Sequence, residues 1–511
     1  MRTFRTVLEQ RIWERRQTLE EFAEYAETFA REHGEPGTLG VRHLQRLIAG
    51  RGPKGQPLGP VRPATARLLE SIFELRVDEL LAPPAVGAGA DVPVLREGFA
   101  AVLEWFDEYA GWKRGTAGRR VHGSVVGDRS AGRRKIGREQ LAGLLAEYYS
   151  DSVQGCGMYG IRCGEKEVAT TIVTRPGWLD LACVLGEGDQ LTYAPDAPPP
   201  PRRMDDLGLN AAVRRLAEVA GSGVRMSDVP LYRLVDIEAR TGKITGTVTE
   251  ASFVEYALTM DLLERELVDA IAAREPALLL RGRYLPNLAS VLDLSGRLCA
   301  GGVLALCAIA RPADRYRGPA DYALLVQKRS ETVLNAAGRL AVIPKGFHQP
   351  MNDVRADAQI GVTLLRELEE ELFGRGEVDI TATTRRIAAP MHPGRTSEPM
   401  RWLLEQPGRL RMECTGFGLN LVSGNYEFAS LIVIEDDEFW ARYGGHIEAN
   451  WESTGLRVYS SLDRELHGEL ISEESWSNEG LFAFCEGLRR LAQLGGDRVN
   501  VPSMELTASG R

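Results

Sequence analysis

The segment RELEEEL, residues 366–372, contains the residues whose types and spacing most clearly suggest chemistry. On a helix, Glu367, Glu370 and Glu371 fall at positions i, i+3 and i+4, so their carboxylates share one face. These carboxylates repel each other unless a cation or an arginine neutralises them, and a hard divalent cation such as Mg²⁺ prefers oxygen ligands. The segment therefore indicates either a site for such a cation or a solvated acidic helix face, which is common.

An apolar strand and a glycine turn precede this helix in the segment AVIPKGFHQP, residues 341–350. The turn would deliver the chain to the head of the helix, which we expect to begin near Asp353. Lys345, Gly346 and His348 of the turn are candidate ligand-binding residues, at a place where a bound phosphate could be contacted. For His348 the alternative is that it has no specific role, which is the commoner case for a loop histidine.

Together, PKG at 344–346 and REL-x-EE at 366–371 resemble the Nudix box, in which a glycine-led loop precedes a helix that carries glutamates. The resemblance extends along residues 283–496, through the strands LCAGGVLALCAIA, YALLVQKRS and FASLIVIEDDEF and a closing helix, NEGLFAFCEGLRRL. It implies an α/β/α sandwich that acts on nucleoside diphosphates linked to another group.

The Nudix resemblance also implies roles for individual residues. Glu367, Glu370 and Glu371 would be ligands of Mg²⁺, and Gly346 would shape the loop. Glu370 and Glu371 would be catalytic if the domain hydrolyses its ligand.

The box departs from the family pattern at three places. Asn352 stands where the pattern has a glutamate, and Phe373 stands where it has a glycine. The twenty positions from Gly346 to Arg366 include six inserted residues. Because the reaction depends on positioning a phosphate chain, these departures leave both hydrolysis and binding alone as alternatives.

The first 82 residues show helical periodicity and contain one helix suited to DNA recognition, in VRHLQRLIAGR at 41–51. Its apolar residues, Leu44, Leu47 and Ile48 among them, are expected to face a core. The candidate DNA-binding residues are Arg42, His43, Gln45, Arg46 and Arg51. Arginine and glutamine on an exposed helix face can reach guanine and adenine edges in the major groove.

The charge of this region also favours DNA binding. Between Glu35 and Glu70 there is no acidic residue, but there are six basic ones, and attraction to phosphates is the main source of non-specific DNA affinity. The region resembles the XRE family of helix-turn-helix regulators, including the VDELL that follows its last helix. The resemblance implies that residues 41–49 form the recognition helix. A small helical bundle that binds protein is the alternative.

The pattern along the chain predicts a multidomain protein with an all-α helix-turn-helix domain at 1–82 and a C-terminal α/β/α Nudix-like sandwich at 283–496. Residues 83–140 are expected to form a linker with a short helix and a mobile basic Gly/Arg stretch at 111–138. Residues 141–282 form a mixed α/β middle region without a motif that indicates chemistry. The tail after residue 496 is expected to be loose.

The composition, 44% hydrophobic and 26% charged residues, is that of an ordinary soluble globular protein. The net charge of -9 excludes a chain coated with nucleic acid along its whole length, but it is compatible with a local basic face. The seven cysteines form no CxxC pair and are expected to be reduced thiols. The sequence shows no signal peptide and no apolar run long enough to span a bilayer, so a cytoplasmic protein without a membrane partner is expected.

These features favour a bacterial transcription regulator that binds double-stranded DNA as a homodimer and senses a nucleotide-like small molecule with its Nudix-like domain. The alternative is a Mg²⁺-dependent Nudix hydrolase of nucleoside diphosphate derivatives, which its N-terminal domain only localises. The two hypotheses differ in whether the C-terminal domain changes its ligand or only binds it.

Overall fold

The computed structural model divides into two compact units, the N-terminal unit Met1–Val92 and the C-terminal unit Pro93–Arg511. Each unit has its own hydrophobic core. The residues described are 5–14, 19–32, 39–49, 61–73, 75–82, 97–124, 136–200, 204–222, 226, 228–274, 277–329, 338–373, 391, 396–444 and 453–509.

The N-terminal unit is helical over its described residues, as its periodicity predicts. The helices are α1 (Val7–Glu14), α2 (Leu19–Glu32), α3 (Val41–Ala49), α4 (Pro63–Phe73) and α5 (Val77–Leu81). Apolar side chains at helical spacing meet in one core, which includes Leu8, Phe22, Leu44, Leu47 and Leu68. The inner face of α3 is therefore held by the other helices, and this leaves its opposite face for solvent.

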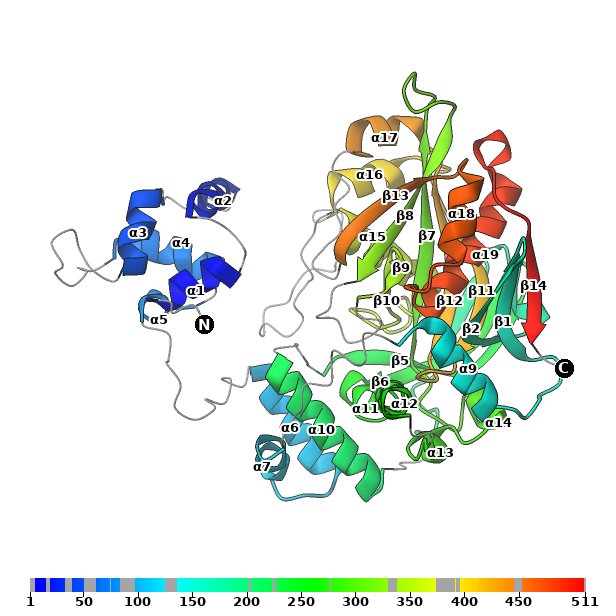
Figure 1. Ribbon diagram of the computed structural model, residues 1–511, viewed down its shortest axis with the longest axis horizontal. Coiled ribbons are helices and arrows are strands. Elements are labelled where there is room, and N and C mark those ends of the chain that lie inside the picture. Colours follow the sequence, from blue (N-terminus) through cyan, green and yellow to red (C-terminus); the bar gives the residue numbers. More distant parts are fainter. Residues whose placement is uncertain are drawn as a thin grey trace. The chain divides into compact units, whose positions relative to one another are not determined.

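The C-terminal unit is built on a mixed sheet whose main strands run in the order β13-β8-β7-β12-β11-β2-β1-β14 (Figure 1). β7 and β12 are parallel, and the other neighbours in this order are antiparallel. The short strands β9, β10 and β3 pair with β8, β7 and β11. The bounds are β1 Gly157–Cys163, β2 Lys166–Thr174, β3 Cys183–Val184, β7 Gly301–Arg311, β8 Asp321–Arg329, β9 Leu340–Val342, β10 Lys345–Phe347, β11 Leu410–Asn420, β12 Tyr426–Ile434, β13 Ser453–Ser460 and β14 Met504–Ser509.

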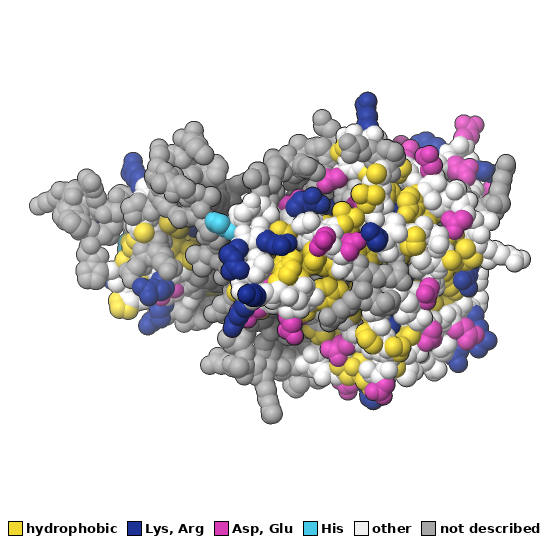
Figure 2. Space-filling view, turned by 90° about the horizontal axis from the view of Figure 1, so that it is seen from below, with side chains coloured by type: hydrophobic (Ala, Val, Ile, Leu, Met, Phe, Trp, Pro, Cys, Tyr) yellow, Lys and Arg dark blue, Asp and Glu magenta, His cyan; other side chains and the backbone are white. Residues whose placement is uncertain are grey.

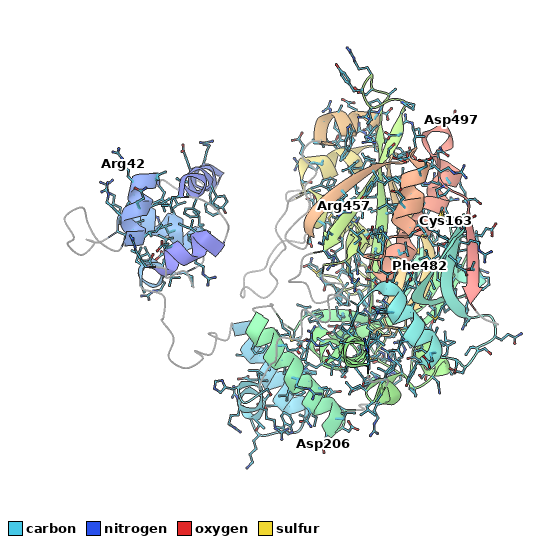
Figure 3. The ribbon with its side chains drawn as sticks, viewed as in Figure 1. Arg42, Cys163, Asp206, Arg457, Phe482 and Asp497 are labelled. Atoms are coloured by element: carbon cyan, nitrogen blue, oxygen red, sulfur yellow. The ribbon has the colours of Figure 1, made fainter. Side chains whose placement is uncertain are left out.

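Helices cover both faces of this sheet. α19 packs on one face, where Phe482 contacts Tyr159 of β1 at a ring-centroid distance of 4.8 Å (Figure 3). The apolar side of α15 belongs to the core on the other face. The helices are α6 Glu97–Tyr109, α7 Thr116–His122, α9 Arg138–Tyr148, α10 Asp206–Ser222, α11 Phe253–Ala257, α12 Leu262–Ala273, α13 Arg281–Tyr284, α14 Leu288–Leu292, α15 Ile360–Leu372, α16 Glu398–Glu405, α17 Asp437–Tyr443, α18 Arg464–Ile471 and α19 Asn478–Leu494.

The most apolar stretch of the chain is Leu298 to Ala310, and its length predicts a strand. Most of it forms the central strand β7. Leu304 and Leu306 lie in the core under α19, whereas Val303 and Ala305 lie in the core on the opposite face. A strand buried on both faces is apolar at every position, because successive side chains point to opposite sides. In the part of the chain that the structure describes, no helix is long and apolar enough to cross a membrane.

The regions predicted as a middle region at 141–282 and a Nudix-like domain at 283–496 belong to one compact unit. β1 and β2 from the former extend the sheet formed by the strands of the latter. The tail predicted to be loose contains β14, which pairs with β1 along six residues of register (Figure 1). Pairing between strands so far apart in sequence has no local signature, which is why the periodicity did not reveal it.

Candidate functional site

The acidic helix α15 begins at Ile360, so the predicted start near Asp353 is wrong. The Asp357 carboxylate accepts the backbone N–H groups of Met351, Asn352 and Asp353 at 2.8 to 3.0 Å. A side chain that satisfies the backbone in this way favours turns over helix. The residues beyond the glycine-led loop therefore form a separate turn segment before the helix starts.

The start of α15 is anchored by a second sheet, whose strands lie in the order β4-β6-β5. The bounds are β4 Asp189–Tyr193, β5 Pro230–Arg240 and β6 Lys243–Ser252. The Asp189 carboxylate accepts the N–H of Gly361 at 3.1 Å. The Gln359 side chain accepts the N–H of Leu191 at 3.0 Å and donates to its carbonyl at 2.9 Å. A region without a predicted role thus fixes where the acidic helix begins.

The glycine-led loop and the acidic helix meet at Gly346 and Glu367. Gly346 lies in β10 and pairs with Val303 of β7. A Cβ atom at position 346 would lie 2.2 Å from the carboxyl carbon of Glu367, so any other residue would displace that carboxylate. Glycine at this position therefore lets the Glu367 carboxylate lie against the loop backbone.

Glu371 and Lys345 form a second contact between the helix and the loop. The Lys345 N–H donates to Glu371 Oε2 at 2.8 Å. The Lys345 ammonium group forms an ion pair with Glu479, at the start of α19. The backbone of Lys345 therefore binds the carboxylate of Glu371 while its side chain binds that of Glu479. Both predicted loop residues, Lys345 and Gly346, thus contact a glutamate of the acidic helix.

Two further members of the acidic segment are Arg366 and Glu370. The Arg366 guanidinium bonds Glu367 at 2.8 Å and the carbonyl of Gln349 at 3.4 Å. Burial lowers the pKa of Arg366, but Glu367 and Glu370 outweigh it, so the pKa is raised overall. Arg366 thus neutralises part of the negative charge that, on the sequence alone, a divalent cation could neutralise. Among the residues that the structure describes, no group of three or more His, Cys, Asp or Glu side chains is arranged to hold a metal ion.

His348 has a structural position, which corrects its expected place beside a bound phosphate. Its side chain is fully buried, with Nε2 donating to the Ala358 carbonyl at 3.0 Å and Nδ1 lying 2.9 Å from the Tyr426 hydroxyl. Burial lowers the pKa of His348 to about 3. With both ring nitrogens engaged and the ring neutral, His348 joins the turn segment to β12.

Two carboxylates that the sequence analysis missed lie in the same interior region. Glu427 of β12 pairs in register with Gly302 of β7. Burial, with the neighbouring Glu479, raises the pKa of Glu427 to about 8. Burial, with Asp261 and Glu479, raises the pKa of Glu264 on α12 to about 7. The detectable signal for Glu427 was one acidic residue at the head of the apolar run FASLIVI.

The outer face of α3 is the second candidate site. Arg42, Gln45 and Arg46 are exposed and His43 is half-buried, whereas Leu44 is in the core. Figure 3 shows the Arg42 side chain pointing away from the other helices of the unit. The predicted Arg51 lies outside the described residues.

The local field at this face is positive. The pKa of His43 is lowered by burial first and then by the charges of Arg46 and Arg62. Arg62 precedes α4, so basic groups from two parts of the chain act on one position. Because burial and the neighbouring cations favour its neutral form, the His43 imidazole can donate or accept a hydrogen bond without adding repulsion.

Comparison with known proteins finds no family model and no curated protein that matches this chain. What the protein can do chemically is therefore inferred from its two candidate sites. One is an exposed helix face with two arginines and a glutamine. The other is a partly buried set of carboxylates held against a glycine-led loop.

Proposed function

We propose that this protein is a transcription regulator that binds double-stranded DNA through α3 and a nucleotide-type metabolite through its C-terminal unit. The observation that carries the proposal is the face of α3, where Arg42, Gln45 and Arg46 are exposed side by side over a buried apolar stripe. A helix with such a face can enter the major groove while the stripe holds it on its domain. A homodimer would supply the affinity that one small module lacks.

The first test is the enrichment of fragmented genomic DNA by the full chain at physiological salt. We expect a few sites to be enriched, and the R42A/R46A variant to lose at least about tenfold in this selectivity, since each bidentate base contact is worth about 1–3 kcal/mol. The matched control is R11A/R76A, which removes two exposed arginines from other parts of the same unit. Equal behaviour of the two double variants would refute a recognition role for α3.

The regulatory part of the proposal requires coupling between DNA and ligand. Coupling is reciprocal, so a ligand that changes DNA affinity must have its own affinity changed by the same factor. The contact of Gly346 with Glu367 is the place in the C-terminal unit where we expect the ligand. A ligand affinity that is identical with and without operator DNA would refute the sensing role.

The second candidate function is hydrolysis of a nucleoside diphosphate derivative. It is favoured by the double contact between loop and helix, at Gly346 with Glu367 and at the Lys345 N–H with Glu371. Glu367, Glu370 and Glu371 would be the ligands of Mg²⁺, although Glu367 and Glu371 as placed already accept bonds from protein groups. Metal affinity is thus part of what must be tested.

If the unit is a hydrolase, we expect E371Q to abolish turnover, measured as phosphate or nucleotide release with and without Mg²⁺. The matched control is E369Q, since Glu369 is a buried carboxylate of the same helix that accepts hydrogen bonds from the N–H and the hydroxyl of Ser397. Equal losses in both variants would assign Glu371 a structural role. Absence of turnover by the native chain across such derivatives would leave the regulator as the sole candidate.

A further inference from the structure

The basic stretch at 111–138, expected to be mobile, begins with an ordered segment. Gly115 adopts φ +82°, which glycine tolerates, and starts α7. The carboxylate of Asp107, a buried residue of α6, accepts the N–H groups of Gly115 at 2.5 Å and Ala117 at 2.6 Å. The Asp107 carboxylate beneath this segment is thus satisfied by backbone groups and hidden from solvent, and residues 111–124, expected to be part of a mobile stretch, contain the helix α7 instead.

The outer side of this segment carries cations. Lys113, Arg114, Arg119, Arg120 and His122 are all exposed. No acidic residue occurs between Glu108 and Asp128. In the view from this side of the C-terminal unit, several Lys and Arg side chains gather close together (Figure 2).

Most of these cations are available to bind an anionic group of a partner. Arg114 is paired with Glu104. Arg120 lies over the Trp112 ring at 4.2 Å, which holds its guanidinium group in place without neutralising it. Within the described part of the chain, Lys113, Arg119 and Arg120 form no ion pair with a carboxylate.

The side chains exposed around these cations indicate which kind of partner they bind. None of the large apolar residues that the structure describes as exposed lies between residues 97 and 124. A membrane-binding surface combines cations with apolar side chains that enter the lipid, whereas a phosphate backbone needs cations alone. Charge without exposed apolar groups therefore fits duplex DNA better than a lipid surface.

We propose that Lys113, Arg119 and Arg120 form a second DNA-binding surface, which contacts the phosphate backbone without reading sequence. This inference rests on the proposed regulator function and extends it, because it gives the C-terminal unit a direct part in holding DNA. Affinity would then come from both units, while sequence selectivity would come from α3 alone.

The test measures binding of the full chain to a random-sequence DNA duplex over a range of salt concentrations. Each neutralised phosphate contributes about 0.9 to the slope of log affinity against log salt, so we expect K113A/R119A/R120A to reduce the slope by about two to three. The matched control is K166A/K243A/R315A, which removes three exposed cations elsewhere on the same unit. Equal slopes for the two triple variants would overturn the inference.

The outcome separates this inference from the function on which it rests. Loss of slope in the triple variant, without any site selectivity in the native chain, would refute the regulator and keep the surface. Selectivity with an unchanged slope would refute the surface alone. Preferential binding to phosphatidylserine vesicles, lost in the same variant, would overturn DNA as the partner.

Discussion

The K345M variant is expected to lose about 3–5 kcal/mol of unfolding free energy at pH 7, the usual effect of removing one partner of a buried ion pair. Lys345 and Glu479 have side chains only 13% and 9% exposed. Burial raises the pKa of Glu479, but Lys345 outweighs it and the pKa is lowered overall. Glu427 lies close enough for both residues to shift its pKa. Without the ammonium group, the buried Glu479 carboxylate would lose its ion-pair partner.

The loss should depend on pH in a defined direction. The pKa of Glu427 is raised from 4.5 to about 8, so the folded state binds more protons than the unfolded state across this interval. Its contribution to stability is full below pH 4.5 and falls as pH rises towards 8. Removing Lys345 raises the pKa of both carboxyls further, so the gap between K345M and the native chain should widen as pH rises.

Urea unfolding of the full chain at pH 5, 7 and 8.5 measures this effect. The double variant K345M/E479Q is the control, since it also removes the carboxylate left unpaired and should recover part of the lost stability. A loss below about 1 kcal/mol at pH 8.5, or a gap that narrows as pH rises, would contradict the ion-pair assignment.

The R281M variant is expected to lose at least about 3 kcal/mol, because each buried group left without its partner costs about 1–3 kcal/mol. Arg281 is fully buried. Its guanidinium donates to the carbonyls of Leu421, Val422 and Leu263, as well as to the hydroxyl of Tyr149. These groups lie on the β11–β12 connection, on α12 and beside α9, so one side chain ties three segments together.

The matched control for this variant lies two residues away on the same short helix. Arg283 is 61% exposed and pairs with Asp205 at 3.0 Å, so R283M should change stability by less than about 1 kcal/mol. Thermal unfolding of both variants compares the loss of a positive charge in the two environments. Equal shifts in Tm would show that the carbonyl cluster does not depend on Arg281.

The helical pattern of the N-terminal unit was predictable because its information is local. The spacing of Leu44 and Leu47 placed them in a core, and the structure buries both. Arg42 and Arg46 alternate with them at intervals that put the arginines on the other face, where they are exposed. Periodicity of 3.6 residues determines which side of a helix is apolar, whatever the helix packs against.

The acidic helix was predicted in type but not in extent. RELEEEL lies on α15, and the contact of Gly346 with Glu367 agrees with a loop that delivers the chain to the helix. The start at Ile360 depends on Asp189 and Gln359, which link the helix to β4. Bonds between segments so far apart have no trace in the spacing of either segment.

By itself, the sequence determined the helical pattern of the N-terminal unit, the type of the acidic and closing helices, the apolar strand β7 and where the acidic and basic groups concentrate. Only the tertiary structure decided that β14 completes the sheet, that Glu427 shares the interior with Lys345, and that Arg281 joins parts assigned to different domains. The physical reason is the distance along the chain over which each kind of interaction acts. Periodicity and charge runs act over a few residues, whereas strand partners and buried ion pairs are selected by what else fills the same interior.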